Sequence, residues 1–115
     1  MNPKPYEIWL IRFPFSDLTS AKVRPALILA VHRQEFIVSG IFSKIPSETI
    51  PKTWVLVPEI HPQFSQTGLK KTSLIRGDKI ATVDRSIFQI QLGLLPSDLA
   101  ISVREAIAIA LGLSE

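Results

Sequence analysis

The stretch KVRPALILA, residues 22–30, sets a basic pair and a proline directly against a run of apolar residues. An apolar run of this length, rich in leucine and β-branched residues, predicts a β-strand. The proline biases Arg24 toward an extended conformation just before the strand. A guanidinium at the edge of a core is costly without a partner. That partner is solvent, a carboxylate such as Asp17 or Glu7, or a ligand such as a phosphate.

Length and composition predict one domain over residues 1–115. The chain has 115 residues, of which 46% are apolar, enough for one continuous core. It has no cysteine, which fits a cytoplasmic location, and its two histidines lack metal-ligand spacing. We therefore expect no metal and no cofactor. The longest apolar segments fall short of the roughly 20 residues that span a bilayer, so we expect no membrane partner.

The positive charge is concentrated in two blocks. The net charge is +3, and residues 20–44 and residues 70–85 each sum to +3, which leaves about −3 for the rest. The blocks form one polyanion-binding face if the fold brings them together. The alternative is two solvated strand faces.

Proline and glycine divide the chain into short elements. Residues 7–13 and 25–31 read as a hairpin with a long polar loop, and residues 36–43 and 53–57 as two further strands. SLI and KIATV, on either side of an Arg-Gly pair, complete five or so strands. So many strands in about 80 residues predict a small, strongly bent sheet or barrel.

A helix is predicted at the C-terminus. Ser97 or Asp98 can cap its start, and Gly112 can end it. Apolar residues recur every four positions in between, which predicts one stripe closing over the sheet. The stripe consists of Leu99, Val103, Ile107 and Leu111.

The common enzyme motifs GxSxG, HExxH and the phosphate-binding loop are missing from the sequence. Arg24 is a candidate phosphate clamp, and Asp17 in the polar loop SDLTSAK that precedes it is a candidate acid or base. Ser43 and Lys44 end the third strand and are candidate phosphate contacts. His32 is either a general base or structural. Four aromatic side chains serve either the core or base stacking, namely Trp9, Phe13, Phe15 and Phe42.

The order of several motifs resembles the PemK/MazF family of type II toxins. They are EIWLIRFPFSD, then KVRPALILA, then TGLKKTSLIRGDKIATVDRS and LGLLPSDL, and they extend over nearly the whole chain. The resemblance implies a mainly β fold, an SH3-like bent β-barrel with a C-terminal helix, as in MazF, PemK and CcdB. It also implies a homodimer, a cognate antitoxin encoded nearby, and a metal-independent endoribonuclease that cleaves single-stranded RNA.

The resemblance assigns roles to particular residues. Arg24 corresponds to the active-site arginine of the family, with Ser43 and Asp17 as further catalytic candidates. The RNA-binding candidates are the basic residues Lys22, Arg24, Lys44, Lys70, Lys71 and Arg76.

Two positions depart from the family pattern. Phe42 stands where the family has a threonine in an I-T-S stretch, and Tyr6-Glu7 replaces Gly-Asp. Ser43 supplies the missing hydroxyl only if a bulge or the strand end turns it inward, because successive strand residues face opposite ways. A one-residue shift in the alignment would also restore the hydroxyl.

Three functions therefore compete. The first is an active ribonuclease toxin that uses Arg24. The second is a weakened homologue that binds RNA or an antitoxin, with Phe42 stacking a base. The third is a toxin on the same barrel that targets a protein, as gyrase poisons do; the basic blocks favour RNA over this last alternative.

Overall fold

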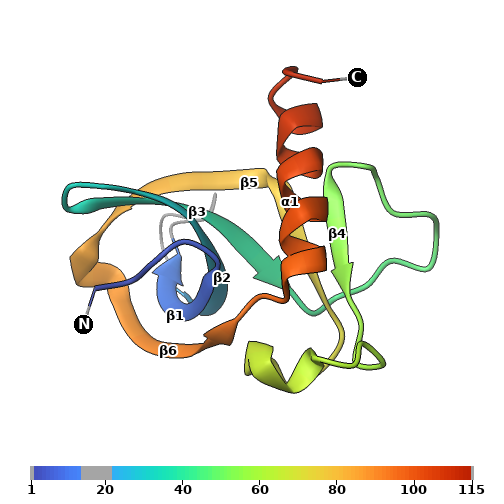
Figure 1. Ribbon diagram of the computed structural model, residues 1–115, viewed down its shortest axis with the longest axis horizontal. Helices are drawn as coiled ribbons and strands as arrows, with labels where there is room; N and C mark the ends of the chain where they lie inside the picture. The colour runs from blue at the N-terminus through green and yellow to red at the C-terminus, as the bar shows by residue number, and fades with distance from the viewer. Residues whose placement is uncertain (1, 14–21, 115) are drawn as a thin grey trace.

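Six strands pair into one antiparallel sheet within residues 2–13 and 22–114, the part of the chain that the computed structural model describes (Figure 1). The order across the sheet is β4-β5-β3-β2-β1-β6. The strands are β1 (Glu7–Phe13), β2 (Lys22–His32), β3 (Glu35–Phe42), β4 (Trp54–Val57), β5 (Ser73–Asp84) and β6 (Phe88–Leu94). Two 3₁₀ turns, η1 (Phe64–Thr67) and η2 (Arg85–Ile87), and one helix, α1 (Ser97–Ala110), complete the fold.

The sheet bends so strongly that both of its faces are buried along β1 and β2. Leu27 belongs to a core cluster with Val103 of α1, whereas its neighbours Ala26 and Ile28 belong to a second cluster with Phe88. Successive strand residues point to opposite faces, so a strand buried on both faces needs an unbroken apolar run. This explains why β2 lacks an apolar-polar alternation.

The predicted bent, barrel-like fold with a C-terminal helix is confirmed. The sheet does not close, because β4 and β6 are edge strands with one neighbour each. The helix α1 packs against β4 and β5 (Figure 1). No helix in the described part of the chain has the length and apolar character needed to span a bilayer.

Two strand predictions were wrong. β6 was missed, although its sequence FQIQL alternates apolar and polar residues as a half-exposed strand does. SLI and KIATV are parts of one strand, β5, because the Arg76–Lys79 segment bulges opposite Gly40 of β3 and does not end the strand. β2 also begins three residues before the predicted start, at Lys22.

The helix has the predicted extent, but its caps differ. The N-cap residue is Pro96, so the predicted capping by Ser97 or Asp98 is wrong, and the Asp98 carboxylate accepts a hydrogen bond from His61 Nε2 at 2.9 Å. At the other end, Gly112 has φ +73°, and the Leu113 and Gly112 amides donate to the carbonyls of residues 108 and 109. These bonds form a Schellman motif.

The apolar stripe of α1 is confirmed except at its last member. Leu99 and Val103 are buried and Ile107 is half-buried against the core. Leu111 is 59% exposed, because the helix has already ended at Ala110.

Candidate functional site

The start of β2 and the end of β3 lie side by side because the two strands are antiparallel. Their pairing begins at Ala26 opposite Gly40, so β2 has only β1 as a partner at Arg24 and Pro25. Proline lacks a backbone N–H, and such a half-paired position tolerates it. The open side of β2 is where a hollow forms.

This hollow, the Arg24 hollow, has a volume of about 340 Å³. Small-molecule pockets measure about 300–1,000 Å³. Its lining comes from β1, β2, β3, β6, the segment before β5 and the first residue of β5. The lining residues are Leu10, Val23, Arg24, Pro25, Ile41, Phe42, Ser43, Gly68, Leu69, Lys70, Lys71, Ser73 and Leu92.

Most of the catalytic and RNA-binding candidates meet at this hollow or beside it. Arg24 is half-buried in its wall, while Ser43, Lys70 and Lys71 are exposed at it. Ser43 lies one residue beyond β3, so the rule that successive strand residues face opposite ways does not direct its side chain away from the hollow. Lys22 is exposed at the start of β2 and is not among the described residues that line the hollow.

The structure tests one of the two carboxylates predicted as salt-bridge partners of Arg24. Glu7 lies at the opposite end of β1 from Ile11, which pairs with Arg24. Its Oε1 accepts hydrogen bonds from the Lys4 amide and from Trp9 Nε1, both at 2.9 Å. Asp17 lies outside the described residues. Glu7 is therefore excluded as the salt-bridge partner, and Asp17 stays a candidate.

The lysine side of the hollow is held by a tight turn against β6. Gly68 follows η1 with φ +73°, and a Cβ there would lie 2.1 Å from the Leu92 carbonyl oxygen. Thr67 is fully buried; its Oγ1 donates to the Phe64 carbonyl at 2.7 Å and accepts from the Leu69 amide at 3.1 Å. This turn delivers Lys70 and Lys71 to the hollow.

A second hollow of about 300 Å³, the Trp54 hollow, adjoins the first through the Phe42 ring, which lines both. Its lining residues are Phe42, Lys44, Pro46, Trp54, Leu74 and Arg76. Arg24 Cζ lies 5.5 Å and Arg76 Cζ 5.7 Å from the centre of the Phe42 ring, and Arg76 Cζ lies 4.3 Å from the centre of Trp54. A row of alternating guanidinium and aromatic groups thus connects the hollows.

Strand register explains this row. Trp54 is paired with Arg76, and Phe42 with Leu74, two residues from Arg76 on the same strand. Continuing the β2–β3 register past its last pair brings Arg24 opposite Phe42. Paired residues share a face of the sheet, so the row runs across four strands on one face.

Asp78 fixes the orientation of Arg76. Its Oδ1 accepts from Arg76 Nε and from Trp54 Nε1, each at 3.0 Å, and its Oδ2 accepts from Arg76 Nη2 at 2.6 Å. The hydrogen bonds from Arg76 lower the pKa of Asp78 below its ordinary value of 3.8. The buried Ser39 hydroxyl donates to the Arg76 carbonyl at 2.6 Å and holds the backbone.

The two basic blocks meet, but at two separate places. Arg24 and Lys44 lie near Lys70, Lys71 and Arg76 around the two hollows. Arg33 and Arg85, one from each block, line another hollow of about 350 Å³ beside the β2–β3 turn. The condition for one polyanion-binding face, that the fold brings the blocks together, is therefore met by only part of each block.

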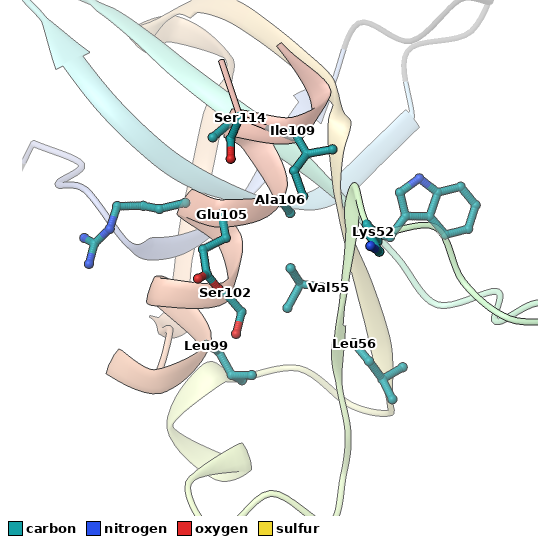
Figure 2. A pocket seen from close by; sticks show the side chains of 12 residues that line it. Lys52, Val55, Leu56, Leu99, Ser102, Glu105, Ala106, Ile109 and Ser114 are labelled. Atoms are coloured by element: carbon teal, nitrogen blue, oxygen red, sulfur yellow. The ribbon is translucent and has the colours of Figure 1, made fainter. Parts of the chain in front are cut away.

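A larger groove of about 800 Å³ lies between β4 and α1 (Figure 2). Figure 2 shows the Val55 side chain of β4 between the two elements, and Ser102 and Glu105 on α1 also line the groove. None of the predicted site residues is among the described residues that line it.

Comparison with known proteins identifies the family. The model for the PemK-like, MazF-like toxins of type II toxin–antitoxin systems matches residues 4–111. The chain belongs to this family. A comparison of the toxin with curated protein sequences gave no match.

Solved structures share the fold of the toxin. A mycobacterial endoribonuclease, solved with its cognate antitoxin, has a TM-score of 0.74 at 18% identity, covering 99% of both chains. The Mycobacterium tuberculosis toxin MazF-mt6 has a TM-score of 0.73 at 23% identity, covering 95% of this chain and 99% of its own. MazF from Deinococcus radiodurans has a TM-score of 0.70 at 21% identity, covering 96% of each chain.

Sequence reasoning missed two residues of the candidate site, Trp54 and Asp78. The signal for Asp78 was present, because Arg76 and Asp78 are two residues apart in a strand and such residues share a face. Trp54 was read only as part of a strand, and nothing local connects it to Arg76.

Proposed function

We propose that the toxin is a metal-independent endoribonuclease that cleaves single-stranded RNA in the Arg24 hollow. The observation that carries this proposal is the half-buried Arg24 beside Ser43, Lys70 and Lys71 in one hollow. Three cations around one cavity suit a phosphodiester, whose charge grows during cleavage. The family membership and the endoribonucleases of the same fold support the choice of substrate.

The proposed reaction needs proton transfer and a charge clamp only. The 2′-hydroxyl of a ribose loses its proton to a general base and attacks the adjacent phosphate. The bond to the next 5′-oxygen breaks and that oxygen takes up a proton from solvent, so the products are a 2′,3′-cyclic phosphate and a 5′-hydroxyl. Arg24 stabilises the charge on the phosphate oxygens and donates a hydrogen bond toward the leaving oxygen. Lys70 and Lys71 hold the flanking phosphates.

We propose one residue for the active-site hydroxyl and one for the general base. Ser43 supplies the hydroxyl, since Phe42 stands at the place of the family threonine and Ser43 borders the same hollow. Asp17 is proposed as the general base. Among the described residues that line the Arg24 hollow, there is no carboxylate and no imidazole.

The test is cleavage of a mixed-sequence RNA in EDTA, with the new ends mapped. Wild type should leave cyclic phosphates, and Arg24→Ala should be slower by on the order of 10²- to 10³-fold. Arg33→Gln, which removes the same charge at the other end of β2, should cut like wild type. Equal cutting by wild type and Arg24→Ala, or none by either, refutes the enzyme proposal.

A second candidate function is RNA or antitoxin binding without efficient cleavage. It is favoured by Phe42, whose ring occupies the wall of the Arg24 hollow where a hydroxyl is expected. Binding of RNA by wild type in the same assay, with no new ends, would support this candidate. If the protein neither cleaves RNA nor binds it, a protein target would be favoured.

We further propose that the toxin acts in the cytoplasm as a homodimer and is neutralised by a cognate antitoxin. Solved relatives include complexes of MazF with MazE and of an endoribonuclease with its antitoxin. A short acidic reading frame next to the gene, whose product copurifies with the toxin and inhibits it, would support the antitoxin proposal. Light scattering would report the dimer.

A further inference from the structure

The Trp54 hollow has a composition suited to a flat, polarisable ligand. Trp54 and Phe42 contribute aromatic rings, and Pro46 and Leu74 contribute apolar surface. Its volume of about 300 Å³ is at the lower end of the range for small-molecule pockets. Base stacking on aromatic side chains is a common way to hold single-stranded RNA.

Hydrogen bonds orient the cationic wall of this hollow. Arg76 is held by two hydrogen bonds to Asp78 and lies 4.3 Å from the centre of the Trp54 ring. Asp78 also accepts from Trp54 Nε1, so the same carboxylate orients the cation and the indole. A ligand therefore meets groups whose geometry is already set, which lowers the entropy lost on binding.

The polar lining has one chemical character. Lys44 and Arg76 are the charged side chains among the described residues that line the hollow, and both only donate hydrogen bonds. The Trp54 N–H is a donor only, and it already donates to Asp78. At one ring edge guanine presents the acceptor O6 and uracil the acceptor O4, whereas adenine and cytosine carry there an amino group, N6 or N4, which needs an acceptor.

The hollow lies next to the Arg24 hollow, and the Phe42 ring is their shared wall. A strand whose phosphate sits at Arg24 reaches the Trp54 hollow with a nearby nucleotide. We propose that the Trp54 hollow is a base-binding subsite that selects a keto base, guanine or uracil, at one position close to the cut. This inference rests on the proposed function for the phosphate at Arg24.

The experiment separates base selection from cleavage. A random-sequence RNA with every 2′-hydroxyl replaced by fluorine binds without being cut, and the bound fraction is sequenced. Wild type should enrich guanine or uracil at one position. Arg76→Gln should lose this preference, and Trp54→Leu should weaken overall affinity by about tenfold, as expected for one lost stacking contact.

Controls distinguish the subsite from charge and folding effects. Lys4→Gln removes one exposed positive charge at the N-terminus and should keep both affinity and preference. Trp54→Phe keeps an aromatic ring and should bind within a few-fold of wild type, and circular dichroism checks that every variant is folded. A positional preference that is missing in wild type, or unchanged in both Arg76→Gln and Trp54→Leu, overturns the inference.

The two proposals fail separately. If natural RNA is cut at Arg24 but neither binding nor cutting depends on a keto base, the subsite is refuted and the ribonuclease stands. If wild type selects a keto base in the fluorinated pool but cuts no natural RNA, the subsite stands and the cleavage proposal is refuted.

Discussion

At the scale of single residues, Phe42 decides the character of the site. It separates two hollows and lies within 6 Å of two guanidinium groups. A guanidinium near an aromatic ring is attracted by the ring's quadrupole, which favours the observed positions of Arg24 and Arg76 and adds to the hydrogen bonds that Asp78 accepts from Arg76. The position that the family pattern assigns to a hydroxyl therefore holds a spacer between cations.

Replacing Phe42 tests whether a hydroxyl is missing from the reaction. We expect Phe42→Thr to raise the cleavage rate by about 10²-fold, the lower range for a positioned proton-transfer group. Phe42→Val removes the ring but adds no hydroxyl, so it should not gain this rate. The measurement is the single-turnover rate on one RNA. Equal rates for the two variants would assign the hydroxyl role to Ser43.

Asp78 makes the stability of the toxin depend on pH. Its pKa is lowered in the folded state by the hydrogen bonds from Arg76, so the ionised form stabilises the fold above its ordinary pKa of 3.8. That contribution is lost as the pH falls through the lowered value. Urea unfolding should show wild type to be more stable than Asp78→Asn near neutral pH, with the difference shrinking in acid. A difference that does not change with pH contradicts this account.

At the scale of elements, the turn after η1 sets the position of Lys70 and Lys71. A side chain at Gly68 is disfavoured for two reasons. Its φ of +73° lies in the left-handed region, and a Cβ would clash with the Leu92 carbonyl oxygen at 2.1 Å. Backbone atoms yield less readily than a flexible side chain. Gly68 therefore allows this turn to pack against β6 and form one wall of the Arg24 hollow.

Gly68→Ala should lower the free energy of unfolding by about 3 kcal/mol or more, because strain and a backbone clash add. Gly112→Ala is the matched control, since Gly112 has the same φ of +73° but nothing within 4 Å of the added Cβ. It should cost about 1 kcal/mol, the left-handed penalty alone. Urea unfolding measures both, and equal losses would show that the contact with Leu92 relaxes freely.

At the scale of the whole molecule, the fold divides the positive charge between two places. The Arg24 and Trp54 hollows hold members of both basic blocks, and Arg33 and Arg85 lie beside the β2–β3 turn. The β2–β3 hairpin extends away from α1 (Figure 1). Only the charges around the two hollows are expected to contact RNA phosphates.

Salt dependence tests this division. Each phosphate contact with single-stranded RNA contributes about −0.7 to the slope of log affinity against log salt concentration. We expect the pair Lys70→Gln and Lys71→Gln to reduce the slope by about 1.4 on fluorinated RNA. The pair Lys4→Gln and Arg33→Gln removes the same charge and should leave the slope unchanged. Equal slopes for both pairs would place the RNA elsewhere.

Much of the fold was predictable because its signals are local. The apolar runs of β1 to β4, the helix from Ser97 and its glycine stop depend on neighbouring residues only, and all are observed. β6 carried an alternating pattern that was overlooked, and the bulge in β5 was read as a break, because a bulge differs from a break only in what the partner strand does.

The candidate site likewise has one part that local sequence predicts and another that depends on contacts between distant residues. Arg24 was predictable from the local sequence, because a charge and a proline stand directly before an apolar strand. Its proposal as a phosphate-binding residue therefore needed no tertiary information. Its meeting with Ser43 and Lys70, and the row from Phe42 to Trp54, were decided by the tertiary structure. Antiparallel register and bulges set which distant residues become neighbours, and no local pattern encodes those distances.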